Sequence, residues 1–221
     1  MTMLELSFFN RDACKVAAQL LGKILYRKHE GYWLRARIIE TEAYYLDEKG
    51  SHASLGFTEK REALFMPPGT IYMYYARGKD SLNISTCGKG NAVLIKSAFP
   101  APDEATIEKM QQLNPSASGG IRPIEKLCNG QTLLCQSLDI KVADWDKRTF
   151  DKELFYIDDT QTRPAKTIQT RRLGIPEGRD EHLMYRFIDY DYARFCTSNP
   201  LTKRKWRNQI DYLIKEFKEE K

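Results

Sequence analysis

The chain has 221 residues, of which 42% are hydrophobic and 29% charged, and its formal net charge is +5. This length and composition fit one globular domain spanning residues 1–221 and exclude a mainly disordered chain. No apolar run approaches the roughly 18–20 residues that cross a bilayer, and residues 1–10, without a basic start or a long apolar stretch, are not expected to form a secretory signal. We therefore expect no membrane contact and an intracellular location, in the cytoplasm or nucleoid if the source is bacterial.

The five cysteines are odd in number and scattered along the chain, and none forms a C-x-x-C pair. The sequence therefore predicts neither a zinc site nor a disulfide framework, and the thiols are expected to be reduced. The basic excess is compatible with DNA as a partner, because neutralised phosphates supply most sequence-independent affinity. Charge alone does not identify such a partner, since many unrelated proteins have a similar excess.

The first predicted element is a helix from Asn10 to Gly22, with Asn10 as its N-cap and Gly22 just beyond its end. Over residues 31–45 the apolar period changes to two, which predicts a strand. The stretches 71–75 and 92–99 also predict strands. Turn signals around them favour antiparallel pairing, because hardly any helical connection separates them.

In the second half, the pattern predicts a helix over 103–113, a Pro/Ser/Gly-rich loop over 114–120 and short helices near 123–128 and 132–138. Residues 141–170 have no clear pattern. An amphipathic helix with a basic start is predicted at the end from the spacing of Trp206, Ile210, Leu213, Ile214 and Phe217. The expected fold is α+β, a compact domain with a curved antiparallel β-sheet flanked by α-helices.

The strand predicted over 31–45 carries Glu40, Glu42 and Tyr44 on the same face as several apolar residues. A carboxylate on such a half-buried face needs a partner or a chemical task. Glu40 or Glu42 could lie at a solvated strand end, pair with an arginine, or take part in catalysis. Further along are an imidazole, three tyrosines, an amide and a cation, which together would suit a site that stacks a flat ring: His52, Tyr72, Tyr74, Tyr75, Asn83 and Lys96.

Five short motifs occur in order in this region: LLGK, RIIETEAY, SHAS, FMPPGTIYMYY and LNIS. Their order and spacing resemble the alkyladenine (3-methyladenine) DNA glycosylase family, closely over residues 20–100 and more weakly as far as Phe187. The resemblance implies a monofunctional enzyme that flips damaged purines out of double-stranded DNA and hydrolyses the N-glycosidic bond, initiating base excision repair. The implied substrates are 3-methyladenine and 7-methylguanine, with hypoxanthine or ethenoadenine as further ones. It implies a monomer without cofactor or metal.

By this resemblance, Glu42 is the base that deprotonates the attacking water. Tyr44 and Tyr74 would stack on the two faces of the flipped base. A methylated purine is positively charged, so a tyrosine face would attract it more strongly than a normal purine.

The same resemblance places His52 in the base pocket and makes Asn83 the residue that crowds the exocyclic amine of normal guanine. Lys96, where the family commonly has arginine, would help to hold phosphate and water, without the planar fork of a guanidinium. The side chain that fills the gap left by the flipped base would be Tyr75 or Arg77, because the sequence is one residue short of the family pattern here.

Three other functions remain open at this point. A catalytically idle nucleic-acid-binding module that recognises unusual bases would have the same aromatic platform. A metal-dependent hydrolase would use Glu40, Glu42 and His52 as ligands. A bifunctional lyase would need a lysine that forms an imine with the sugar, and no lysine stands at a motif position expected of a nucleophile.

Overall fold

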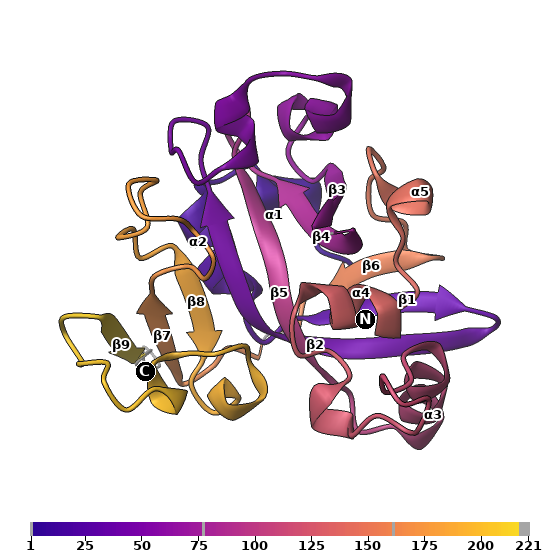
Figure 1. Ribbon diagram of the computed structural model, residues 1–221. Helices are drawn as coiled ribbons and strands as arrows, with labels where there is room; N and C mark the ends of the chain where they lie inside the picture. The colour runs from indigo at the N-terminus through magenta and orange to yellow at the C-terminus, as the bar shows by residue number, and fades with distance from the viewer. Residues whose placement is uncertain (1, 77, 161, 217–221) are drawn as a thin grey trace, which may run out of the picture.

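The computed structural model describes residues 2–76, 78–160 and 162–216, which form an antiparallel sheet with helices around it (Figure 1). Seven strands follow the order β3-β4-β5-β2-β8-β7-β9, while β1 pairs with β2 and with β6. The predicted α+β class is therefore confirmed, and the sheet does not close into a barrel. The strands are β1 Ile24–His29, β2 Tyr32–Tyr44, β3 Ile71–Ala76, β4 Lys79–Ser85, β5 Ala92–Pro100, β6 Phe155–Asp158, β7 Lys166–Thr170, β8 Arg186–Asp189 and β9 Tyr212–Glu216.

Over the described residues the chain also forms five α-helices and five short 3-10 helices. The α-helices are α1 Leu6–Phe9, α2 Ala13–Leu20, α3 Glu104–Leu113, α4 Gln131–Ser137 and α5 Val142–Trp145. The 3-10 helices are η1 His52–Leu55, η2 Glu59–Phe65, η3 Ile124–Lys126, η4 Ala193–Phe195 and η5 Pro200–Thr202. Within the described ranges, every helix is too short or too polar to cross a bilayer.

The helix predicted from residue 10 begins later than expected. Asp12 caps α2, because its side chain accepts a hydrogen bond from the backbone N–H of Lys15 at 3.0 Å. The N-cap assigned to Asn10 is wrong, since Asn10 instead ends the short helix α1. The apolar stripe of α2 is fully buried and packs on β2 and β5.

Strand β2 is the centre of the sheet and contains an irregularity that alternation could not reveal. Its register against β5 shifts between Ile38 and Thr41, at Glu40. Beyond the shift, Thr41 donates a hydrogen bond to a backbone carbonyl of α2 at 2.8 Å, and Ala43 packs in the same core as Ile38. The predicted single face from Ile38 through Glu40 and Glu42 is therefore wrong, because both carboxylates lie on the side away from α2.

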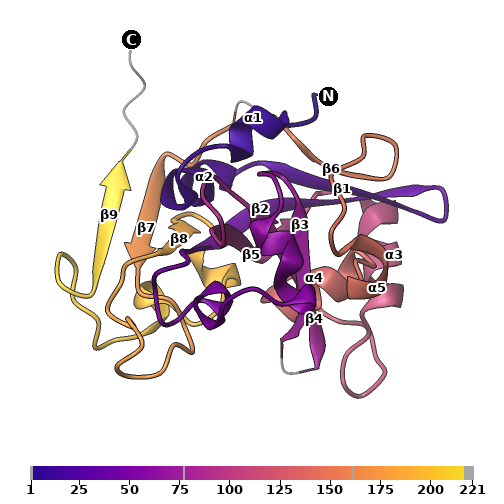
Figure 2. The same ribbon diagram turned by 90° about the horizontal axis from the view of Figure 1, so that it is seen from above.

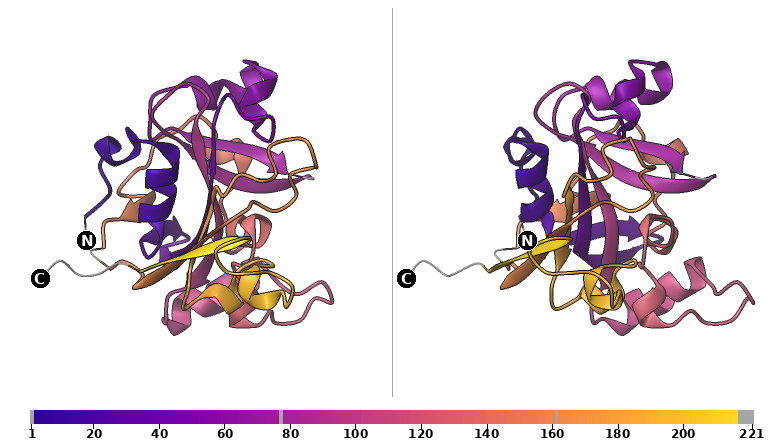
Figure 3. Two further views of the ribbon diagram at one scale, coloured as in Figure 1. Left: turned by 90° about the vertical axis from the view of Figure 1, so that its left-hand side faces the viewer. Right: turned by 60° about the vertical axis from the view of Figure 1, so that its left-hand side comes forward.

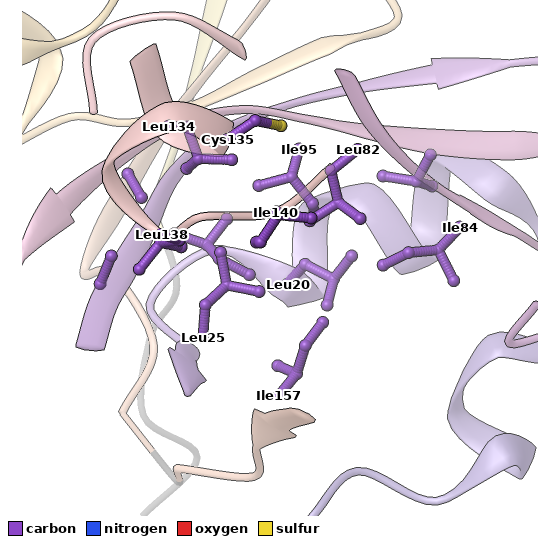
Figure 4. Packing of buried hydrophobic residues seen from close by; sticks show 14 of the residues in the cluster. Leu20, Leu25, Leu82, Ile84, Ile95, Leu134, Cys135, Leu138, Ile140 and Ile157 are labelled. Atoms are coloured by element: carbon purple, nitrogen blue, oxygen red, sulfur yellow. The ribbon is translucent and has the colours of Figure 1, made fainter. Parts of the chain in front are cut away.

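The main hydrophobic core fills the space between the curved sheet, α2 and α4 (Figure 4). Its side chains come from seven strands and from helices that include α2 and α4, and examples are Leu20, Leu25, Leu82, Ile95, Leu134 and Ile157. Helices α1 and α2 lie on one side of the sheet, and the loop between β7 and β8 lies on the other (Figures 2 and 3). The core thus packs against the face of β2 that is turned toward α2.

Several predicted elements are confirmed and one is wrong. The strands predicted over 31–45, 71–75 and 92–99 are β2, β3 and β5, and the helix over 103–113 is α3. The predicted C-terminal helix is instead a turn followed by β9, whose Ile214 pairs with Ile168 of β7. Phe217 of that prediction lies outside the described residues. The prediction of one domain over 1–221 stays a prediction.

Candidate active site

A cavity of about 950 Å³ opens on the side of the sheet away from α2, within the size range of small-molecule sites. Its walls come from the end of β2, from η1, β3, β4 and β5, from the start of α4 and from the loop between β7 and β8. That loop reaches toward the same side as the β3–β4 hairpin (Figure 3). The predicted site residues that line the cavity are Tyr44, His52, Tyr74, Tyr75, Asn83 and Lys96.

Glu42 lies beneath this cavity and is fully buried. Its Oε2 accepts a hydrogen bond from the hydroxyl of Tyr44 at 2.7 Å, and its Oε1 is 3.6 Å from Nζ of Lys96. Oε1 has no hydrogen-bond partner among the described residues. Glu42 itself does not line the cavity, but Tyr44 and Lys96, which contact its two oxygens, do. A buried carboxylate oxygen without a hydrogen bond beside a cavity is costly, which indicates a chemical task.

Glu40 is also fully buried, but its carboxylate is saturated. It accepts hydrogen bonds from Nε of Arg186 at 2.7 Å, from Oγ of Ser97 at 2.5 Å and from the backbone N–H and hydroxyl of Thr197 at 3.0 and 2.7 Å. Burial raises its pKa, but Arg186 and these hydrogen bonds together lower it by more, so the pKa lies below its ordinary value. Of the open alternatives, pairing with an arginine is the one that describes Glu40.

The proposed metal triad does not assemble. The oxygens of Glu40 are held by Arg186, Ser97 and Thr197, so they are not directed toward His52. Over residues 2–76, 78–160 and 162–216, no group of three or more His, Cys, Asp or Glu side chains is arranged to hold a metal ion.

The aromatic rings form two groups around the cavity. The guanidinium of Arg172 lies over the ring of Tyr44, with Cζ 4.5 Å from the centroid. The rings of His52 and Tyr74 lie 4.2 Å apart, and Tyr72 stacks on Tyr74 at 5.5 Å. Burial and the neighbouring Glu42 raise the pKa of Tyr44 well above its usual range, so its phenol stays protonated and donates to the carboxylate.

His52 is held at the start of η1, where Ser51 caps the turn. Its Nδ1 is 3.3 Å from the hydroxyl of Tyr72. Burial lowers the pKa of His52, and the positive charges of Arg61 and Arg179 lower it further, so the ring is neutral at pH 7. The turn is backed by Gly90, where a Cβ would come within 3.0 Å of Ala53 and 2.9 Å of Leu46, so only glycine fits there.

Asn83 lies on β4 opposite Tyr72 and is nearly fully buried. Its side-chain amide donates to the backbone carbonyl of Tyr72 at 3.2 Å, which fixes its orientation at the cavity wall. Nζ of Lys96, on β5, donates to Oε1 of Gln131 at 3.4 Å in addition to its contact with Glu42. Arg77, one of the two wedge candidates, lies outside the described residues.

Arg172, Glu48 and Arg186 were missed at the level of sequence. Arg172 makes a two-pronged ion pair with Glu48 at 2.5 and 2.6 Å and also donates to the carbonyl of Ala43 at 3.0 Å. These partners are more than a hundred residues apart in the chain, so no local pattern marks them. From sequence alone, a charged residue in a loop is expected to be exposed to solvent, because its partner is not known.

The arrangement fits an enzyme that hydrolyses a bond beside a flat ring. The sequence model of the family described as Methylpurine-DNA glycosylase (MPG) matches residues 7–193. The chain therefore belongs to the methylpurine-DNA glycosylase family, whose members are hydrolases that act on DNA, and the resemblance found in the sequence is confirmed.

Relatives of similar length share the name "Putative 3-methyladenine DNA glycosylase". A protein of Pseudomonas savastanoi pv. phaseolicola is 60% identical over 211 residues, which cover 94% of each chain. One of Pseudomonas aeruginosa strain UCBPP-PA14 is 58% identical over 212 residues, covering 94% of this chain and 89% of the relative. One of Clostridium beijerinckii is 32% identical over 209 residues, covering 92% and 100%.

Proposed function

We propose that this protein releases alkylated purines, 3-methyladenine and 7-methylguanine first among them, from double-stranded DNA. It hydrolyses the N-glycosidic bond and leaves an abasic site, the product from which base excision repair starts. One observation carries the proposal. The buried carboxylate of Glu42 has one oxygen hydrogen-bonded to Tyr44, and the other lacks a hydrogen bond and lies 3.6 Å from Nζ of Lys96, directly beneath an aromatic cavity.

In this mechanism Glu42 is the general base. The hydroxyl of Tyr44 holds Oε2, so Oε1 takes the proton of the water that attacks the sugar carbon. The same anion stabilises the positive charge that develops on the sugar as the bond breaks. Lys96, 3.6 Å from Oε1, orients the water and attracts a neighbouring phosphate. General-base catalysis of this kind contributes about 10²–10⁴-fold to the rate.

The aromatic rings supply the binding energy for the everted base. Rotating a nucleotide out of the duplex costs a few kcal/mol, and each stacking contact returns about 1–3 kcal/mol. We assign one face of the base to Tyr44 and the other to Tyr74 with His52, whose rings contact each other. Because His52 is neutral at pH 7, it does not repel a positively charged alkylated purine.

Selectivity and the contact with DNA depend on three further side chains. Asn83 is held rigidly at the cavity wall and would clash with the exocyclic amine of guanine. Tyr75 is 60% exposed at the cavity mouth and is our choice for the wedge that fills the gap in the duplex. Leu55, 62% exposed, lines the same cavity and adds an apolar contact to the DNA. Arg77 stays the alternative wedge.

A panel of duplexes, each with one damaged purine, tests this function. We expect release of free base and formation of abasic sites from 3-methyladenine and 7-methylguanine duplexes, with normal duplex unaffected. Binding to these duplexes without any base release would instead identify a recognition module and overturn the proposal.

Two controls in the same assay separate the other chemistries. Activity in EDTA is expected to equal activity without it, whereas loss on chelation would indicate a metal-dependent hydrolase. Borohydride is expected not to trap the protein on DNA. Trapping that disappears in Lys96→Gln would show that the amine in the cavity forms an imine with the sugar, which would contradict a purely hydrolytic route.

A further inference from the structure

Arg172 is buried behind the ring of Tyr44, in the loop that follows β7. Both of its terminal nitrogens donate to Glu48, which is equally buried, and one of them also donates to the backbone carbonyl of Ala43. Burying an ion pair is rarely the most stabilising use of space, because packed apolar side chains are often as stable. A buried cation placed against the ring of a binding pocket therefore invites a functional explanation.

The guanidinium determines which face of Tyr44 is open. Its Cζ lies 4.5 Å from the ring centroid, so one face is covered and only the other can meet a base. The ring is also held at its edge, where the hydroxyl donates to Glu42. The position of Tyr44 is thus fixed by contacts at one ring face and at its hydroxyl.

The same contact changes what the open face attracts. A cation over an aromatic face is attracted by the electron-rich π system. Arg172 already uses that attraction from behind, and its positive charge also repels a second cation across the ring. The preference of Tyr44 for a positively charged base over a neutral one is therefore weaker than that of a tyrosine with no cation behind its ring.

We propose that Arg172 is a selectivity-determining residue that shifts the pocket toward uncharged damaged purines, such as deaminated or etheno-bridged ones, relative to cationic alkylated purines. Glu48 moderates this effect, because it neutralises part of the charge behind the ring. The inference rests on the proposed function, in which Tyr44 stacks on the flipped base.

Single-turnover release of 7-methylguanine, a cation, and hypoxanthine, a neutral base, from otherwise identical duplexes provides the test. The quantity compared is the rate of 7-methylguanine release divided by the rate of hypoxanthine release. Arg172→Gln/Glu48→Gln removes both charges and keeps an amide pair, and we expect the ratio to rise about tenfold in favour of 7-methylguanine. Glu48→Gln alone leaves the cation without its counter-charge, so the ratio should fall. Arg172→Lys keeps the charge and should slow both reactions with little change in the ratio.

Opposite shifts in the two Glu48 variants cannot come from a general loss of packing. Equal slowing of both lesions in every variant would overturn the inference and reduce Arg172 to a structural residue. A fall in the ratio for the double variant would overturn it as well. If the double variant does not fold, the direction of the shift in Glu48→Gln decides. A wild-type protein that releases neither base would instead contradict the proposed function itself.

Discussion

Glu40 and Glu42 stand two residues apart on β2, yet substitution of Glu40 should lower stability, whereas substitution of Glu42 should lower the rate of base release. Glu40→Ala removes the carboxylate that accepts hydrogen bonds from Arg186, Ser97 and Thr197. Arg186 is fully buried and would retain three uncharged acceptors, the backbone carbonyls of Thr197 and Ser198 and the hydroxyl of Thr197. Leaving one partner of a buried pair uncompensated costs about 3–5 kcal/mol, a large share of the roughly 5–15 kcal/mol that keeps a domain folded.

The measurement is urea and thermal unfolding, both followed by circular dichroism, with the exposed Glu59→Ala as the matched control. At about 2–4 °C per kcal/mol for a chain of this size, thermal unfolding should shift by about 10 °C. The folded pKa of Glu40 lies below its ordinary value of 4.5, so its stabilisation is complete above pH 4.5 and is lost as the pH falls through the folded pKa. The difference from wild type should shrink in acid. A Glu40→Ala protein as stable as Glu59→Ala at pH 7 would refute the reasoning.

Three further predictions concern the cavity. The pKa of His52 lies below its ordinary 6.5, so release of 7-methylguanine should fall as the pH drops below 6.5, with a component that His52→Gln lacks; an identical pH profile in the variant would count against it. Asn83→Ala should release normal guanine faster than wild type, and unchanged discrimination would remove Asn83 from selectivity. Tyr75→Ser should weaken lesion binding by about tenfold, as loss of one stacking contact would, whereas Tyr75→Phe should not; equal losses would indicate a role for the hydroxyl.

The fold was predictable where local pattern and tertiary context agree. The alternating first half of β2 and the helix α3 are examples. The C-terminal prediction was wrong because helical spacing of apolar residues does not require a helix. Ile210 is 56% exposed there, while Ile214 pairs with β7, so pairing with the sheet edge overrode the local pattern. The register shift at Glu40 has no local signal, which is why both carboxylates were placed on the wrong face.

The candidate site was predictable as far as its motifs reach. The family resemblance identified Tyr44, His52, Tyr74, Asn83 and Lys96, and the structure brings all of them to one cavity. Which of two neighbouring glutamates keeps an oxygen without a hydrogen bond depends on partners far away in the chain, such as Arg186 and Thr197. Those partners meet only after folding, so the distinction between a structural and a chemical carboxylate needed the three-dimensional arrangement.

The most direct test of the central claim is single-turnover base release by Glu42→Gln from a 7-methylguanine duplex, beside Glu59→Gln as control. We expect the rate to fall by at least about 100-fold, the contribution of a general base, while affinity for the damaged duplex and stability remain near wild type. The amide keeps the shape of the side chain but cannot take a proton from water. Base release by Glu42→Gln at a rate close to that of Glu59→Gln would contradict the account.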